Sequence, residues 1–358
     1  MKIEGLNHQF RAYLNTPRCG LMHSDSQGIA ATIYRELAEQ GSERNASFFL
    51  EDMDKIRNQV GEFFGTKAAN VAFLPNFSLG MNAVAEVLEN SKVLVFEQEY
   101  PSVLMPLESR PLELIKFDSS DGFHFDLDQI ETLIRDQGID AFVVSHVQFK
   151  AGYMIDLDKA SEICKRHNCS LIVDATQSAG IVPIDFDALK LDVLITSGYK
   201  WLNAGFGNGL GLFSEEFLDR FPPREAGFGS MSLSSNGWKY AISAKNYEPG
   251  HIAPVTLYLL EDAIRKQSQL GRDVIYKEAM RLTDYAVKKL QGLDRKIIGG
   301  ESIDRASIIT LTCESSEFEA LVKEQIITVH MDGLLRIGVH YHNTEAEIDA
   351  LCEVLSSS

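Results

Sequence analysis

Long apolar runs are missing from this sequence of 358 residues. No segment reaches the roughly 20 consecutive apolar residues that cross a bilayer, and Met1 leads into a polar stretch that does not match a signal peptide. Basic residues are also scarce, because 34 lysines and arginines stand against 51 aspartates and glutamates, for a formal net charge of −17. Such a chain is repelled by nucleic acid and by anionic membrane surfaces. We therefore expect a cytoplasmic protein whose partners include neither.

Cysteine is scarce as well. The five cysteines are scattered and odd in number, which suits reduced thiols better than a disulfide framework. Cys164, His167 and Cys169 stand close together, but no second pair of candidate ligands lies nearby, so a zinc site is not favoured. We predict no metal site.

The sequence contains no internal repeat, low-complexity block or Pro/Gly/Ser-rich linker. With 45% hydrophobic residues, the chain can bury a large core, and its length indicates two lobes. Because no linker separates them, we expect these lobes to be interwoven. The predicted parts are an N-terminal arm (1–24), a large α/β domain (25–245) and a small C-terminal α+β domain (246–358).

Strand patterns alternate with helical patterns through the large domain. The strand patterns are short apolar runs of the kind that suits strands buried on both faces. They cover residues 70–74, 92–96, 112–117, 141–147, 170–174, 193–195 and 210–213. This rhythm predicts a mostly parallel sheet with helices on both faces, and such sheets bind ligands at the carboxyl ends of their strands.

Two of these strand ends carry opposite charges. Asp174 ends one apolar run, and Lys200 follows another, between the aromatic residues Tyr199 and Trp201. A lysine in such surroundings can lose hydration, so that its pKa falls and it becomes a nucleophilic amine. A pyridoxal phosphate site needs this pair, because the lysine forms a Schiff base with the cofactor's aldehyde while the carboxylate keeps the pyridine nitrogen protonated.

Two motifs around these residues, Asp174-Ala175-Thr176-Gln177 and Ser197-Gly198-Tyr199-Lys200-Trp201, resemble those of the class V aminotransferases. That family also holds cysteine desulfurases, kynureninases and isopenicillin epimerase-like enzymes. The resemblance runs in collinear order from about Asp52 to Glu347. It implies the type I fold of pyridoxal-phosphate-dependent transferases: a large α/β domain with a mostly parallel seven-stranded sheet and a smaller α+β C-terminal domain. It also implies pyridoxal 5'-phosphate as cofactor, with Lys200 as the Schiff-base lysine and Asp174 as its catalytic partner.

The resemblance assigns further contacts to the cofactor. Phe77 and Ser78 stand where the family carries its Gly-Thr-Thr-like phosphate loop, at the start of a helical pattern that suits a phosphate. Tyr100 matches a ring that stacks on the pyridine face. Gln148 stands near the family's side-chain amide to the phenolic oxygen, although a shift by one residue would place Phe149 there. The other cofactor-binding residues implied are Asp174, Gln177, Ser197, Tyr199 and Lys200.

Two motifs near the C-terminus complete the resemblance. The run from Arg336 to Thr344 resembles the family's R-x-S-x-x-x-Y-N-T-E, whose arginine binds the substrate α-carboxylate through a bidentate pair. The segment from Asn246 to His251 resembles R-F-E-x-G-T, whose threonine touches the phosphate of the neighbouring subunit's cofactor. The resemblance therefore implies cofactor binding by His251 and a homodimer with a shared active site.

The reaction type is less constrained, because one carbanion intermediate feeds transamination, racemisation, β-elimination and desulfuration. A cysteine desulfurase needs a mobile-loop cysteine shortly before the carboxylate-binding arginine, whereas Cys313 ends a predicted strand. We predict an aminotransferase acting on an amino acid. The alternative is a lyase or epimerase of the same family, kynureninase-like or epimerase-like, with desulfuration least favoured.

Two other classes of protein compete with this interpretation. A nucleotide-binding protein would use the glycine-rich run from Gly205 to Gly209 as its phosphate loop, but that run leads into a strand, whereas a dinucleotide loop opens a helix. A cofactor-binding protein without catalysis would explain the departures at the phosphate loop and at 246–251. The retention of Lys200, Asp174 and Arg336 together opposes it.

Overall fold

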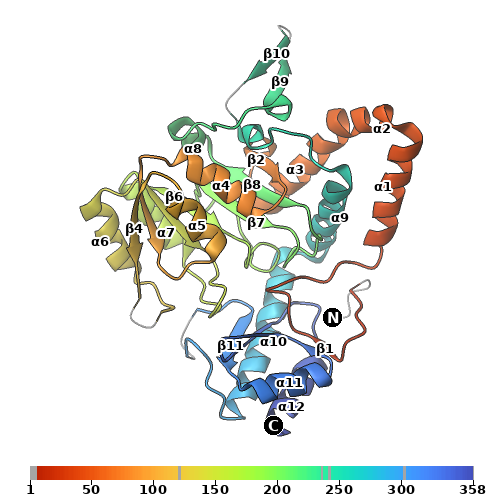
Figure 1. Ribbon diagram of the computed structural model, residues 1–358, viewed down its shortest axis with the longest axis vertical. Coiled ribbons are helices and arrows are strands. Elements are labelled where there is room, and N and C mark those ends of the chain that lie inside the picture. Colours follow the sequence, from red (N-terminus) through yellow and green to blue (C-terminus); the bar gives the residue numbers. More distant parts are fainter. Residues whose placement is uncertain (1–5, 120–121, 235–236, 241–242, 301–303, 358) are drawn as a thin grey trace.

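A seven-stranded sheet forms the centre of the larger lobe in the computed structural model, which describes residues 6–119, 122–234, 237–240, 243–300 and 304–357 (Figure 1). The strand order is β2-β8-β7-β6-β5-β3-β4. The bounds are β2 (Val71–Leu74), β3 (Lys92–Phe96), β4 (Glu113–Phe117), β5 (Ala141–Ser145), β6 (Ser170–Asp174), β7 (Val193–Ser197) and β8 (Gly209–Phe213). Neighbours from β4 to β7 are parallel, whereas β8 runs antiparallel to both β7 and β2. The predicted mostly parallel sheet is confirmed.

Successive residues of each strand face two separate apolar cores. In β6, Leu171 and Val173 belong to one core, while Ile172 belongs to the other. The first core lies under α3 (Met53–Phe64), α6 (Leu127–Gln137), α7 (Leu157–Arg166) and α9 (Pro254–Leu270). The second lies under α4 (Phe77–Val87), α5 (Pro101–Glu108) and α8 (Glu215–Arg220). Because a strand has a period of two and both faces are covered, consecutive residues such as Leu171, Ile172 and Val173 are all apolar.

The smaller lobe is built on an antiparallel sheet of order β11-β14-β13. Its strands are β11 (Ile308–Thr312), β13 (Val329–Met331) and β14 (Leu334–Gly338), and its helices are α10 (Arg272–Gln291), α11 (Ser315–Lys323) and α12 (Glu345–Ser357). Asp332 and Gly333 both have positive φ, 51° and 76°, in the turn between β13 and β14. These angles suit the tight hairpin that the Asp-Gly pair predicts.

The N-terminal arm joins the smaller lobe. Its strand β1 (Ala12–Tyr13) pairs in parallel with β12 (Ile326–Ile327), and Asn15 bridges to Gly338. In contrast, α1 (Ser26–Gln40) packs against α9 on the larger lobe, and α2 (Ser42–Ser47) extends beyond it (Figure 1). The two lobes are therefore interwoven, and the domain boundaries at 24 and 245 stay a prediction. Among the described helices, none is both long and apolar enough to cross a membrane.

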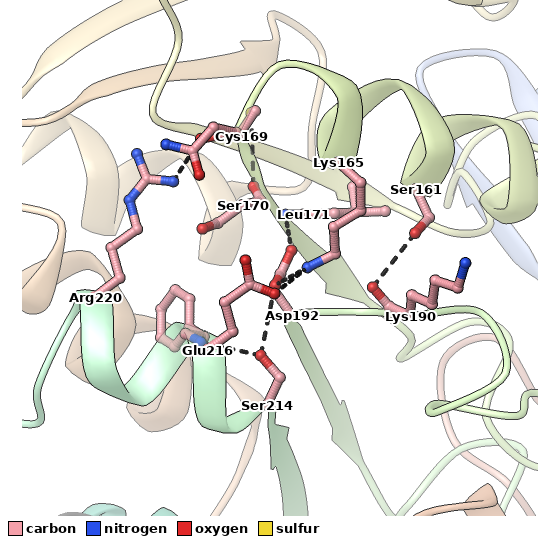
Figure 2. A network of polar contacts seen from close by, with 12 residues as sticks. Ser161, Lys165, Cys169, Ser170, Leu171, Lys190, Asp192, Ser214, Glu216 and Arg220 are labelled. Atoms are coloured by element: carbon pink, nitrogen blue, oxygen red, sulfur yellow. Dashed lines mark hydrogen bonds and ion pairs between the residues drawn. The ribbon is translucent and has the colours of Figure 1, made fainter.

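A polar network fixes the amino-terminal end of β7. The buried Asp192 carboxylate accepts hydrogen bonds from Lys165 Nζ and from the backbone N–H of Leu171, each at 2.8 Å. Figure 2 shows that Ser214 and Glu216, from the β8–α8 corner, also contact Asp192 and Lys165. Burial raises the pKa of Asp192, and the Lys165 ammonium opposes that rise. This network ties α7, β6 and α8 together at the sheet edge opposite to the strand ends that carry Asp174 and Lys200.

Candidate active site

A cavity of about 560 Å³ opens at the carboxyl ends of β5, β6 and β7. Of the residues predicted from the sequence, those that line it are Phe77, Ser78, Tyr100, Asp174, Gln177, Ser197, Tyr199 and Lys200. A larger surface groove, of about 920 Å³, lies along α10 and α12. It is lined by paired charges such as Lys289 and Asp349, 2.8 Å apart, and by none of the predicted residues. The smaller cavity is the candidate active site.

Lys200 and Asp174 are both buried in this cavity, with exposed fractions of 7% and 9%. Burial lowers the pKa of Lys200 to about 8, an effect that the Asp174 carboxylate opposes and the Arg336 guanidinium reinforces. Burial likewise raises the pKa of Asp174, against hydrogen bonds from Thr176, the charge of Lys200 and the nearby Ser145 hydroxyl. The Lys200 amine is therefore unprotonated over a wider pH range than a solvated lysine, which makes it a nucleophile and a base.

The first turn of α4 points its amino-terminal end at the cavity. Asn76 caps the helix, since its side chain accepts from the Leu79 N–H at 3.0 Å. Ser197 Oγ accepts from the Phe77 N–H at 3.0 Å, which fixes the helix start to the end of β7. Ser78 Oγ also lies 3.0 Å from Ser102 Oγ. A positive helix end beside hydroxyl groups is suited to an anion such as a phosphate.

Aromatic rings form the walls around Lys200. Its Nζ lies 5.7 Å from the ring centroids of both Tyr100 and Tyr199. Tyr100 contacts Phe149 edge-to-face at 5.2 Å, and Tyr199 stacks on Phe206 at 4.6 Å. Tyr100 is 41% exposed in this chain and lines the cavity, so it is accessible to a ligand there.

Two predicted cofactor-binding residues lie outside this cavity. The buried Gln148 side chain turns away and donates from Nε2 to Glu99 Oε1 at 2.9 Å, while its neighbour Phe149 lines the cavity. His251 packs instead against the rings of Phe49 and Phe228, at 4.7 Å and 5.9 Å. Within one chain, the structure therefore does not bring Gln148 or His251 together with Lys200.

Arg336 approaches the site from the smaller lobe. Its side chain is 7% exposed, and Nη1 donates to the backbone carbonyl of Phe149 at 2.9 Å. Its buried Nε has no hydrogen-bond partner among the described residues. Burial lowers the pKa of Arg336 to about 10, and its charge is close enough to lower the pKa of Lys200. A buried guanidinium with unused donors is suited to a carboxylate ligand.

Sequence reasoning missed the residues that hold the Lys200 loop in place. Gln177 Oε1 accepts from Trp201 Nε1 at 2.8 Å, and Gln177 Nε2 donates to the Pro17 carbonyl at 3.0 Å. The Trp201 carbonyl in turn accepts from Gln267 Nε2 at 2.8 Å and is 3.0 Å from His340 Nε2. Both lobes thus bind the residue next to Lys200, and the arm holds one of its partners, Gln177, a convergence that no single motif reveals.

A second missed residue is Glu99, which directly precedes Tyr100. It is 3% exposed, and its carboxylate accepts from the Ser145 N–H at 2.8 Å and from Ser145 Oγ at 2.5 Å. Burial raises the pKa of Glu99 to about 6, against the hydrogen bonds from Ser145, and the charge of Asp174 adds to the rise. The signal for it in the sequence was a carboxylate beside the predicted stacking ring, after the apolar run 92–96 had ended.

The displaced pKa of Lys200 predicts a pH dependence of stability in the cofactor-free protein. Between pH 8 and its usual value of 10.5, the folded protein has released the Lys200 proton that the unfolded chain still holds. The free energy of unfolding must therefore rise with pH in this window, by up to about 3 kcal/mol. Urea unfolding at pH 7.5, 9 and 10.5 should show this rise in the wild-type protein and its loss in Lys200→Met.

Lys150→Met is the matched control, because Lys150 is an exposed lysine that directly follows Phe149 of the cavity lining, and its loss should leave the slope unchanged. Equal slopes for the wild-type protein and Lys200→Met would show that Lys200 titrates normally.

Comparisons with known proteins agree with this geometry. A family model described as Aminotransferase class-V matches residues 30–351. The chain is 25% identical over 307 residues to an uncharacterized aminotransferase, YcbU, of Bacillus subtilis, covering 84% of this chain and 82% of that protein. It is 26% identical over 336 residues to a probable cysteine desulfurase of Borreliella burgdorferi, covering 83% and 79%.

Solved structures share the fold over nearly the whole chain. An apo cysteine desulfurase from Thermococcus onnurineus superposes with a TM-score of 0.87 at 21% identity, covering 100% of this chain and 99% of that chain. The cystine C-S lyase C-DES, in complex with cysteine persulfide, also gives 0.87, at 19% identity and 97% coverage of each chain. The site's lysine, carboxylate and helix end fit the cofactor of this family. The chain belongs to the class V aminotransferase family of pyridoxal-phosphate-dependent enzymes, with their type I fold.

Proposed function

We propose that this enzyme is an aminotransferase that acts on an amino acid through Lys200. The observation that supports it is the Lys200 amine, buried beside Asp174, with a pKa lowered by burial to about 8. A fraction of this amine is unprotonated at neutral pH, which nucleophilic attack and proton abstraction both require.

The residues present would hold pyridoxal phosphate along the cavity. The first turn of α4, with Ser78 and Ser197, would hold its phosphate, Tyr100 would cover its ring, and Asp174 would hold the proton on its ring nitrogen. Once bound, the cofactor supplies an electron sink for the electron pair released at the substrate α-carbon.

Lys200 has two tasks in this proposal. Its Nζ would hold the cofactor in the resting enzyme and, once the substrate's amino group has displaced it, would take the proton from the substrate α-carbon and pass it to the cofactor, so that a keto acid is left. His146 is unsuited to take that proton, because burial lowers its pKa to about 4 and it does not line the cavity. Arg336 would orient the substrate by its α-carboxylate, so that the α-carbon proton faces Lys200.

The positions of the cysteines argue against desulfuration. All five lie in the described part of the chain, and none lines the cavity. Cys313, the cysteine that precedes Arg336, is buried, and its Sγ lies 3.4 Å from the Glu314 carbonyl. Burial raises the pKa of Cys313 to about 11, which keeps it a thiol, whereas sulfur transfer needs a thiolate.

An eliminating lyase is the second candidate, favoured by the same absence of a thiol from the described cavity lining and by the shared fold with a cystine C-S lyase. Transamination and elimination would both use Lys200, Asp174 and Arg336. The two reactions differ in products, since elimination releases ammonia and transamination transfers the amino group to a keto acid.

The test is a product assay on the loaded enzyme. A panel of amino acids is supplied with and without pyruvate or 2-oxoglutarate, and keto acid, aminated acceptor and ammonia are quantified. We expect keto acid that depends on the acceptor, in equal amount to the aminated product. Ammonia released without an acceptor would show a lyase instead.

Borohydride reduction and peptide mapping should place the pyridoxyl group on Lys200, and an adduct on Lys150 would refute the assignment.

Arg336→Lys should weaken amino-acid binding strongly. Lysine cannot reproduce two parallel charge-assisted hydrogen bonds, and their loss in a buried site costs on the order of 2–5 kcal/mol. The dissociation constant, from spectral titration, should rise for amino acids and change little for an amine without a carboxylate. The absorbance spectrum of the resting enzyme should stay intact.

Arg305→Lys is the matched control, because Arg305 lies in the same lobe and donates to backbone carbonyls such as that of Ala151, at 2.8 Å. It should leave amino-acid binding unchanged. Loss of the cofactor in Arg336→Lys, or equal weakening for amines and amino acids, would make Arg336 structural.

We also propose a homodimer in which His251 contacts the phosphate of the partner's cofactor. The support is the resemblance of residues 246–251 to the family's cross-subunit segment, together with the position of His251 outside its own chain's cavity, beside the 59% exposed Phe228. Sedimentation equilibrium of the loaded enzyme should give twice the mass of 39.9 kDa. A monomer that turns over substrate would contradict this.

A further inference from the structure

The carboxylate of Glu99 is buried directly behind the candidate active site. It follows β3 and accepts hydrogen bonds from the next residue, Tyr100, and from Ser145 and Gln148 at and just after the end of β5. Its Oε1 accepts from the Ser145 N–H at 2.8 Å and from Gln148 Nε2 at 2.9 Å. Its Oε2 accepts from Ser145 Oγ at 2.5 Å and from the Tyr100 N–H at 3.3 Å. A carboxylate with four donors is fixed in position and can stay ionised although it is buried.

Ser145 connects Glu99 to Asp174. Ser145 ends β5 and Asp174 ends β6, and the two residues are paired neighbours in the parallel register. The Ser145 hydroxyl donates to Glu99, and it also lies beside Asp174 in the cavity lining, close enough to lower the pKa of that carboxyl. Because a hydroxyl has a single hydrogen, it can serve one of the two carboxylates at a time. As long as Glu99 holds it, Asp174 keeps an acceptor position for a ligand.

The negative charges of Glu99 and Asp174 both favour a proton bound near them. Burial raises the pKa of Glu99 most, the hydrogen bonds from Ser145 oppose this rise, and the charge of Asp174 adds to it. The two carboxylates therefore interact electrostatically. The positive charge of Lys200 lowers the pKa of Asp174. A group that binds to Asp174 through a proton would therefore experience the negative charge of both carboxylates.

We propose that Glu99 is a positioning residue for the cofactor's ring nitrogen, acting through Ser145 on Asp174. It keeps the Ser145 hydroxyl away from Asp174 and adds a second negative charge behind it, and both effects favour the proton on that nitrogen. This inference rests on the proposed function, because Asp174 receives the ring nitrogen there. It also assigns a structural role to Gln148, whose side-chain amide helps to fix Glu99.

The test uses the enzyme loaded with pyridoxal phosphate labelled with ¹⁵N in the ring. In Glu99→Gln the negative charge is lost and the Ser145 hydroxyl is free to turn to Asp174, so the ring nitrogen should lose its proton more easily. We expect its pKa, from the ¹⁵N chemical shift, to fall by about one unit or more, which is tenfold in proton affinity. The kcat should fall with little change in KM, because Glu99 touches no substrate.

Three further variants make the result specific. Glu97→Gln removes the same charge from an exposed position two residues earlier and should leave the ¹⁵N shift unchanged. In a Ser145→Ala background the effect of Glu99→Gln should be smaller, since the hydroxyl that connects the carboxylates is absent. If Glu99→Gln does not fold, Glu99→Asp replaces it. The shorter side chain also releases the hydroxyl, so the ring-nitrogen pKa should again fall.

An unchanged ring-nitrogen pKa in Glu99→Gln, or in Glu99→Asp where that variant replaces it, overturns the inference. Asp174→Asn, measured in parallel, separates this failure from that of the proposed function. If Asp174→Asn lowers the ring-nitrogen pKa and the Glu99 variants do not, the role of Glu99 alone is refuted. If Asp174→Asn also leaves it unchanged, the assignment of Asp174 is refuted with it.

Discussion

The attraction between the Lys200 amine and the Asp174 carboxylate is the interaction on which the site depends. Each group is buried, and burial shifts each pKa toward the neutral form, while the charge of the other shifts it back. Each group thus moderates the effect of burial on the other, for Asp174 together with the hydrogen bonds from Thr176. The pair must therefore be placed accurately, and the fold does this by ending two adjacent parallel strands, β6 and β7, at the same edge of one sheet.

The stiffness of this edge comes from elsewhere in the molecule. Two apolar cores hold the strands from both faces, and the Asp192 network fixes their opposite ends (Figure 2). On the side of the site, the Trp201 carbonyl and indole are bound by Gln267 and Gln177, so the residue after Lys200 has little freedom. The pKa values of buried ionisable groups change with small displacements, because charges interact strongly at low dielectric. Rigidity therefore matters most around Lys200 and Asp174.

The sheet and the lysine–carboxylate pair could be predicted because both depend on local patterns. Apolar runs mark buried strands, and polar residues that follow them mark one edge of a parallel sheet. The position of Gln148 could not be predicted in the same way, because a shift of one residue exchanges the two faces of an extended chain. The structure places Phe149 on the cavity side and Gln148 behind it.

Long-range contacts explain what else was missed. Glu99 is held by Ser145, 46 residues further along the chain, and no pattern around Glu99 indicates that pairing. The antiparallel direction of β8 likewise depends on how the chain returns across the sheet and not on the composition of the strand. His251 would acquire its predicted role only from a second subunit, so one chain's sequence and structure leave it among aromatic neighbours.

The pairing of β1 with β12 has a consequence for the synthesis of the protein. The Tyr13 N–H donates to Glu347, a partner 334 residues later, and the arm continues to Gly20, whose N–H donates to the Tyr199 carbonyl beside Lys200. During synthesis the arm therefore lacks these partners until β12 and Glu347 have been translated. Closing such a long loop is among the slowest steps of chain assembly. The arm consequently docks late, and a chain that ends before β12 is left with an open wall next to Lys200.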